Sequence, residues 1–497
     1  MRIFKLILIS TTIFFVSCSN EISNTELVKR QPKISPDYTD IVIPYNIAAL
    51  NFKINESGTD YQVRFILKND EPLIVDTSDG IVKIHADKWR SMLENAKGSQ
   101  LRIEIYAKSL DGKWQEFEPI VNQISVDPID SHLAYRLINA GYVLWNNMGI
   151  YQRNLENFDE KTILENKSFD SGCLNCHSFC NNDPNSMMIH LRAKHGGTII
   201  SQNGKLSKID TKSDYTLNAG AYPCWHPDGK HIAFSTNNIN QHFCNGDVRI
   251  EVSDEFSDII VYDVENKTIS TSPKVSTKNR ENLPVWSPDG KFLYILSAPP
   301  ATTIDNRIYC KYDLLRIGYN VNTKIWSNVD TVLLSSKTGK SISFPKISPD
   351  GKFLMFCMSD FGYFTIHHPS SDLYLLNLET GDYKKMNINS PHTDSYHCFS
   401  STGRWVVFSS KRLDGLYTRP FFSHFDKNGN TSKPFVMPQN NPEFYDGFLK
   451  NYNIPELITG EVPVDEIDMR NAAMQEAMPA HIDASVYKTY MKTHLIN

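Results

Sequence analysis

One short phrase returns along the second half of the chain and limits the fold more than any other feature. It reads WHPDGK at 225–230, WSPDGK at 286–291 and ISPDGK at 347–352, with a degenerate copy, SSTGR, at 400–404. In each full copy proline fixes φ, aspartate accepts hydrogen bonds from nearby amides, and glycine adopts a positive φ. Each phrase therefore predicts a tight turn, and an apolar, strand-like run follows it.

The spacing of the turns defines a repeating unit. Successive prolines, Pro227, Pro288 and Pro349, lie 61 residues apart, and each unit carries a further pair of strand-like runs, such as 258–263 with 268–270. Four short strands in a period of roughly 50 residues are typical of a β-propeller blade. A parallel solenoid would need shorter and more uniform periods. We therefore predict an all-β chain with a propeller.

These phrases closely resemble the TolB-like propeller repeat, a family named for its Pro-Asp-Gly turn. The resemblance covers about residues 220–440 and implies a β-propeller, which we expect over 173–460 with about five to seven blades. Similar propellers precede the hydrolase domain of prolyl-oligopeptidase-like enzymes. Here only about 60 residues follow the last recognisable blade, and the chain contains no G-x-S-x-G phrase, so we expect no serine peptidase and no enzyme.

The flanking segments predict three further parts. Residues 36–128 alternate short strand-like runs with turn signals such as Asp79-Gly80, which favours an immunoglobulin-like β-sandwich. Residues 129–172 are interpreted as a connection into the propeller that could contribute a closing strand. Residues 461–497 form a tail in which 465–478 predicts a short helix, ended by Pro479.

The N-terminus resembles an export signal. Residues 1–17 combine a basic start with an apolar run of about eleven residues, too short to span a bilayer. The run ends Val-Ser-Cys and resembles the lipobox of bacterial lipoproteins, which implies lipidation of Cys18 and a polar tether over 18–35. An ordinary signal peptide with an incidental cysteine is the alternative. Either way the sequence predicts the bacterial cell envelope, and the lipobox predicts anchoring on a membrane, periplasmic or at the outer-membrane face.

A C-x-x-C-H motif at 173–177 is the one constellation with evident chemistry. In an exported bacterial protein it resembles the attachment site of c-type haem. The resemblance implies one covalent haem c, with Cys173 and Cys176 as thioethers and His177 as the proximal axial ligand. The candidates for the distal ligand are His190, Met187, Met188 and His195. We favour His190, because a methionine beside Ile and Leu is more often part of a core.

Three other interpretations of the motif stay open. Cys173, Cys176, His190 and His195 have a spacing close to that of a two-Cys, two-His zinc site, in which Cys180 could replace one ligand. The two cysteines could instead form a disulfide, or the motif could be vestigial. Elsewhere, His367, His368, His392 and His397 could line a propeller mouth, although scattered histidines are the simpler explanation.

Composition narrows the function. The chain has 51 basic and 56 acidic residues, a net charge of −5, so it lacks the excess of cations that coats nucleic acid. We predict an envelope lipoprotein that binds haem for electron transfer or haem-based sensing, with the propeller as a platform for a redox partner or another envelope protein. The alternative is a non-redox propeller interaction protein whose Cys/His cluster is structural, with zinc or no cofactor, or vestigial.

Overall fold

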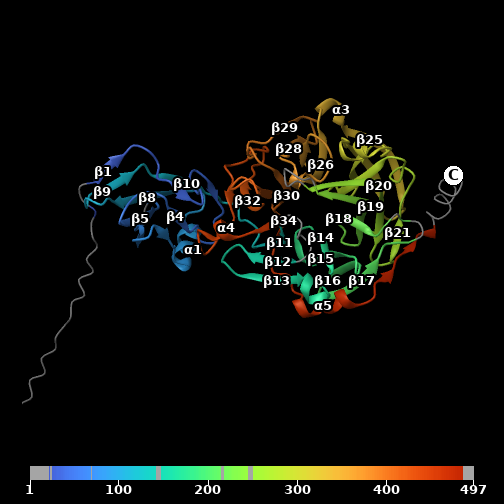
Figure 1. The fold of residues 1–497 in the computed structure, drawn as a ribbon, viewed down its shortest axis with the longest axis horizontal. Coiled ribbons are helices and arrows are strands. Elements are labelled where there is room, and N and C mark those ends of the chain that lie inside the picture. The colour runs from blue at the N-terminus through green and yellow to red at the C-terminus, as the bar shows by residue number, and fades with distance from the viewer. Residues whose placement is uncertain are drawn as a thin grey trace, which may run out of the picture.

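The computed structural model describes residue 22 and residues 25–484, apart from 69, 141–146, 214, 215, 217 and 244–249. Within that range the chain forms an all-β N-terminal domain and a six-sheet β-propeller beside it (Figure 1). The all-β fold class and the propeller are thus as predicted. The lipidation candidate Cys18 and the signal segment 1–17 lie outside the described residues. No helix in the described part of the chain is long and apolar enough to cross a bilayer.

The N-terminal domain consists of two sheets and one helix around a shared core. Its buried side chains include Phe52, Phe65 and Trp89. The tether expected over 18–35 is shorter than predicted, because strands form within 25–35. The first of them, β1, pairs in parallel with β9 and so belongs to the N-terminal domain. The elements are β1 (Thr25–Val28), β2 (Ile34–Ser35), β3 (Val42–Ile43), β4 (Phe52–Ile54), β5 (Asp60–Ile66), β6 (Leu73–Thr77), β7 (Ile81–Val82), α1 (Ala86–Asn95), β8 (Gln100–Lys108), β9 (Trp114–Phe117) and β10 (Ile120–Ile124).

The first blade joins two distant parts of the chain. The segment expected to connect the domains and to supply one closing strand instead forms three outer strands of this blade, and β34 from the end of the propeller pairs with β11 as the inner strand. The expectation for 129–172 is corrected accordingly. The segment HLAYRLIN is mostly apolar on both faces because β11 pairs with a strand on each side and packs against a hydrophobic core on each face. The strands are β11 (His132–Asn139), β12 (Met148–Asn154), β13 (Glu160–Glu165) and β34 (Lys450–Ile458).

Five further blades follow in chain order, each a meander of antiparallel strands. Blade two holds β14 (Cys173–Cys180), β15 (Asp183–Arg192), β16 (Gly197–Gln202) and β17 (Lys205–Asp210), and blade three holds β18 (Gly220–Trp225), β19 (His231–Phe243), β20 (Ile250–Asp263) and β21 (Thr268–Ser270). Blade four holds β22 (Arg280–Trp286), β23 (Phe292–Ala298), β24 (Asp313–Asn320) and β25 (Ile325–Leu333). Blade five holds β26 (Ser341–Ile347), β27 (Phe353–Ser359), β28 (Asp372–Asn377) and β29 (Tyr383–Lys385). Blade six holds β30 (Asp394–Phe399), β31 (Trp405–Ser410), β32 (Arg419–His424) and β33 (Phe435–Val436).

The repeated phrases form the turns between the first and second strands of blades three to six. Gly229, Gly290, Gly351 and Gly403 all have positive φ, between 66° and 73°. In blade four the Asp289 carboxylate accepts a hydrogen bond from the backbone N–H of Lys291 at 3.1 Å, as the turn chemistry predicts. The innermost strands then meet around the centre of the ring, where Figure 1 labels β14, β18, β26, β30 and β34.

The C-terminal tail docks on the outside of the propeller. Helix α5 (Glu466–Met474) starts at Asp465, whose carboxylate accepts a hydrogen bond from the N–H of Asp468, and it buries Met469, Ala472 and Ala473. The helix ends earlier than expected, and the chain then adds β35 (Met478–Pro479) to blade two and β36 (His481–Ile482) to blade three. Short helices α2 (Ile304–Ile308), α3 (Ser335–Thr338), α4 (Phe444–Gly447), η2 (Asn166–Phe169) and η3 (Thr365–His367) lie in the connections.

Candidate functional site: the central channel

The inner strand of every blade is interrupted at the same step by a β-bulge. In β18, for example, the pairing with β19 shifts by one residue between Ala221 and Cys224. A bulge leaves residues unpaired and redirects the side chains around it. In five of the blades the residue in the bulge has a positive φ, between 45° and 51°. These residues are Tyr222, Leu283, Phe344, Tyr396 and Ile454.

The residue after each of these positions faces the central channel. Four blades place a proline there: Pro223, Pro284, Pro345 and Pro455. Blade six places His397 there, and in blade two the shift of β14 brings Cys176 to the channel. The C-x-x-C-H motif therefore lies in a strand, and two of its residues, Cys176 and His177, are part of the wall of the propeller channel.

The placement of the motif decides whether a porphyrin fits. Cys176 and His177 line the channel and are 4% and 1% exposed, whereas Cys173 is half-buried at the start of β14, opposite Arg192, and is not part of the lining. The cavity in the channel has a volume of about 90 Å³. At roughly 10–15 Å³ for each water, this holds on the order of six water molecules. Within the described residues, the two thiols and the imidazole do not converge on a space that would admit a haem.

His177 is held as a neutral imidazole. Burial lowers its pKa to about 3, and the charges of Arg136 and Lys346 act in the same direction. Neither ring nitrogen makes a hydrogen bond of regular geometry. The nearby backbone of Ile454 opposes the pKa shift only in part. An unpartnered, neutral imidazole in the channel wall can accept or donate one hydrogen bond to a bound molecule.

The expected distal ligands are spread over blade two. His190 is buried and its Nδ1 lies 3.0 Å from the hydroxyl of Thr198, while His195 lies in the following turn with Nε2 3.0 Å from Asp170. Met187 and Met188 are fully buried in separate clusters on the two faces of β15. Among the described residues, no group of three metal-binding side chains with converging ligand atoms includes these residues or Cys173, Cys176 or Cys180.

Two charged side chains, Lys346 and Glu456, line the channel and interact electrostatically. Burial lowers the pKa of the Lys346 ammonium, but the nearby Glu456 carboxyl and the thiols of Cys398, Cys224 and Cys176 outweigh this effect and leave the pKa raised. Burial also raises the pKa of Glu456, although Lys346 and the backbone N–H of Phe179, 3.1 Å from its carboxylate, oppose this shift. Lys346 makes no hydrogen bond or ion pair with any described residue within the usual distance limits, so its ammonium remains available inside the channel.

A second space adjoins the central one. It shares Arg136, Asn175 and Tyr222 with the central space and adds Arg192 and His367 to the lining. Arg136 is fixed in place because its Nη1 donates to the backbone carbonyl of Asn175 at 2.6 Å. Burial lowers the pKa of His367 to about 3, so this imidazole is neutral. Together the linings of the two spaces contain three cations, Arg192, Arg136 and Lys346, and one carboxyl group, that of Glu456.

Aromatic rings make up much of the remaining wall. Phe344 and Tyr396 meet edge to face with ring centroids 4.8 Å apart, and Phe364 packs against both. The Tyr396 hydroxyl is buried without a hydrogen-bond partner. Apolar walls with a few charged groups are the usual composition of small-molecule sites.

Sequence reasoning missed Lys346, Glu456 and Arg136 as channel residues, although it named His397 as a possible mouth residue. A signal for Lys346 exists in the repeats. The three aligned phrases read YPCWHPDG, LPVWSPDG and FPKISPDG, so a lysine occupies a position that is Cys or Val in the other two copies. Arg136 and Glu456 offer no such signal, because their blade is assembled from segments about 300 residues apart.

Comparisons with known proteins assign no family to the chain. No protein-family model and no curated protein matches the chain. Among solved structures, hydrazine synthase of Kuenenia stuttgartiensis is 13% identical, with 52% of this chain and 64% of that chain covered and a TM-score of 0.30. The Dos1 propeller is 11% identical over 47% of this chain and 66% of that chain, with a TM-score of 0.29. The Cps50 (Swd1) propeller domain of Myceliophteria thermophila is 9% identical over 54% and 88%, with a TM-score of 0.29. Likeness at this level gives no indication of ligand or reaction.

Proposed function

We propose that this protein is a non-redox, ligand-binding β-propeller whose central channel accepts the carboxylate of a small organic acid. The observation that carries the proposal is the Lys346 ammonium, which lines the channel and makes no hydrogen bond or close ion pair with any described residue. A buried cation with free N–H donors is stabilised by an anion that accepts them.

The surroundings of Lys346 support an anion. Arg192 and Arg136 line the adjoining space, so the charge around the two spaces favours a negative group. Glu456 is the opposing charge, but burial raises its pKa, so this carboxyl gives up its charge more readily than an exposed one. The limited volume favours a carboxylate carried on a short chain, which would lie against Phe344 and Tyr396.

Titration with acetate, succinate and citrate tests the proposal by calorimetry, with inorganic phosphate and methylammonium for comparison. We expect saturable binding of at least one carboxylate and a weaker affinity in Lys346→Met by roughly 30-fold, the equivalent of a charge-assisted hydrogen bond of about 2 kcal/mol. Lys352→Met removes an exposed lysine from the same blade and should leave the affinity unchanged. Equal affinity in the Lys346 variant and the parent, or no saturable binding, would overturn the proposal.

The C-x-x-C-H motif favours a second candidate, a covalent c-type haem protein, which stays a prediction from the sequence. The intact mass of protein exported beside a c-type maturation system separates the two candidates. The channel proposal expects a mass explained by polypeptide and acyl groups. An added haem mass that disappears in Cys173→Ser and Cys176→Ser would favour the haem protein instead.

We also propose that lipidation of Cys18 tethers the domains to an envelope membrane. The support is the lipobox-like sequence that precedes this cysteine. Cys18→Ala should move the exported protein from the membrane fraction to the soluble fraction. An unchanged membrane fraction would contradict the anchor.

A further inference from the structure

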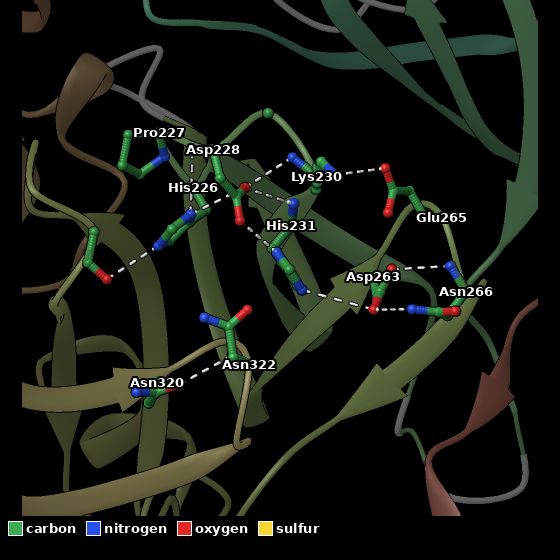
Figure 2. A network of polar contacts seen from close by, with 12 residues as sticks. His226, Pro227, Asp228, Lys230, His231, Asp263, Glu265, Asn266, Asn320 and Asn322 are labelled. Carbon is green, nitrogen blue, oxygen red and sulfur yellow. Dashed lines mark hydrogen bonds and ion pairs between the residues drawn. The ribbon is translucent and has the colours of Figure 1, made fainter.

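The first Pro-Asp-Gly turn carries two histidines that its counterparts lack. His226 and His231 flank the turn of blade three, where blade four has Ser287 and Phe292 and blade five has Ser348 and Phe353. Figure 2 shows the two imidazoles on either side of the Asp228 carboxylate. His226 Nδ1 lies 3.0 Å from one oxygen of Asp228, and His231 Nδ1 lies 2.7 Å from the other.

We propose that His226, Asp228 and His231 form a binding site for a divalent transition-metal ion such as Zn²⁺. One ligand atom from each of the three residues lies within 4.8 Å of the others. Neutral imidazole and carboxylate are ligands that zinc binds in proteins, and three protein ligands leave a fourth position for water or another ligand.

The outer contacts of the two rings suit this role. The Nε2 of His226 lies 3.0 Å from the carbonyl oxygen of Gly290 in the next blade, which can only accept a hydrogen bond. The proton of a neutral ring is therefore on Nε2, and Nδ1 keeps its lone pair on the side of Asp228. The Nε2 of His231 faces the Asp263 carboxylate at 3.7 Å, and Asp263 is held by Asn266. Metal-binding histidines commonly direct their second nitrogen at such acceptors.

The turn itself does not require histidine. In blade four the Ser287 hydroxyl donates to Asp289 at 2.6 Å, and in blade five Ser348 does the same to Asp350 at 2.6 Å. In blade three the backbone N–H of Asp228 donates to His226 Nδ1 at 3.2 Å, a bond that a metal would replace. The same backbone turn thus forms with serine, and the two imidazoles call for another explanation.

Access and local charge also permit a cation. His226 and His231 are 7% and 9% exposed, while Asp228 reaches solvent. The nearest lysine, Lys230, is paired with Glu265 at 2.8 Å and directed away from the three ligands (Figure 2). A surface groove between blades three and four, lined by His226, Asn320 and Asn322, runs beside the site.

Equilibrium dialysis of the chelator-treated protein against Zn²⁺, with elemental analysis, tests the site. We expect one Zn²⁺ per chain, a rise in the unfolding temperature on adding Zn²⁺, and loss of both in the double variant His226→Ser, His231→Phe. This variant introduces the residues that blade four carries at the same positions, which favours normal folding. The matched control, Cys173→Ser with Cys176→Ser, should keep the zinc.

Three outcomes would overturn the site: no bound zinc, zinc retained by the histidine double variant, or zinc lost from the cysteine control. Co²⁺ binding to the unaltered protein gives a readout that needs no variant. We expect ligand-field bands without a sulfur-to-cobalt charge-transfer band, because the proposed ligands are nitrogen and oxygen. A strong sulfur band would place the metal at the cysteines instead. Carboxylate binding in the channel is independent of all of these results.

Discussion

The channel wall and the outer turns are both built from repeated segments, but they differ in what the repeats preserve. At the turns, three blades keep the same Pro-Asp-Gly framework and one copy adds two histidines. In the inner strands, the bulge is kept in every blade, while the residue three positions after the last regular pair varies and is cysteine in two of the six blades. These residues are His177, Cys224, Val285, Lys346, Cys398 and Glu456. A repeated backbone therefore supplies the geometry, and differences between copies supply the chemistry.

The largest expected effect concerns acid stability and the buried imidazole of the channel. His177 has a pKa of about 3 in the folded state against about 6.5 when unfolded, so its contribution is present above pH 6.5 and is lost as the pH falls toward 3. Between pH 7 and pH 4.5 this amounts to roughly 3 kcal/mol of the free energy of unfolding.

Urea unfolding of the parent and of His177→Leu at pH 7 and pH 4.5 measures this effect. The variant should lose less stability on acidification than the parent. Cys224→Ser, at the same position of the next blade, should retain the acid sensitivity of the parent. A pH profile unchanged in His177→Leu would show that this imidazole is not the source.

An intermediate effect on stability should distinguish alanine substitutions at two turn glycines of similar conformation. An added Cβ at Gly290 would lie 2.4 Å from His226 Nε2, whereas at Gly351 it would meet nothing within 4 Å. Both have φ near 70°, so each alanine variant carries the strain of a left-handed residue, about 1 kcal/mol. Gly290→Ala adds about 2 kcal/mol of overpacking. Thermal unfolding should rank Gly290→Ala clearly below Gly351→Ala, and equal losses would contradict the close contact between blades.

The smallest effect compares the two versions of the turn in metal-free protein. Ser348→Ala removes a hydroxyl that donates to Asp350 and accepts from the N–H of Phe353, and should cost about 1 kcal/mol. His226→Ser restores the version of the turn found in blade four and should cost less. Chemical unfolding in the presence of chelator measures both. A greater loss in His226→Ser would mean that the imidazole is part of the turn framework.

Local patterns in the sequence predicted the local structure well. The Pro-Asp-Gly phrases are turns between strands, and Met187 and Met188, which lie beside Ile and Leu, are part of buried clusters as expected. Helix α5 begins at the predicted aspartate. Each of these features depends on residues a few positions apart, whose preferences for turns, strands and caps act without the rest of the fold.

The candidate site was less accessible to prediction because it depends on closure of the ring. Cys176 and His177 were singled out by their spacing, but the bulge that places them in the channel wall is set by the pairing of β14 with β15. Lys346 and Glu456 come together only when six inner strands converge. No pattern within one segment contains that information.

The pairing of β34 with β11 also constrains how the protein is made. Strands β11 to β13 leave the ribosome early, but their inner partner at 450–458 follows only after about 300 further residues. Until then the first blade exposes an unpaired strand edge, which is a template for incorrect pairing with another chain. Chaperone protection of the nascent chain is therefore most needed for its earliest blade, and a truncation of the final tenth of the polypeptide would open the whole ring.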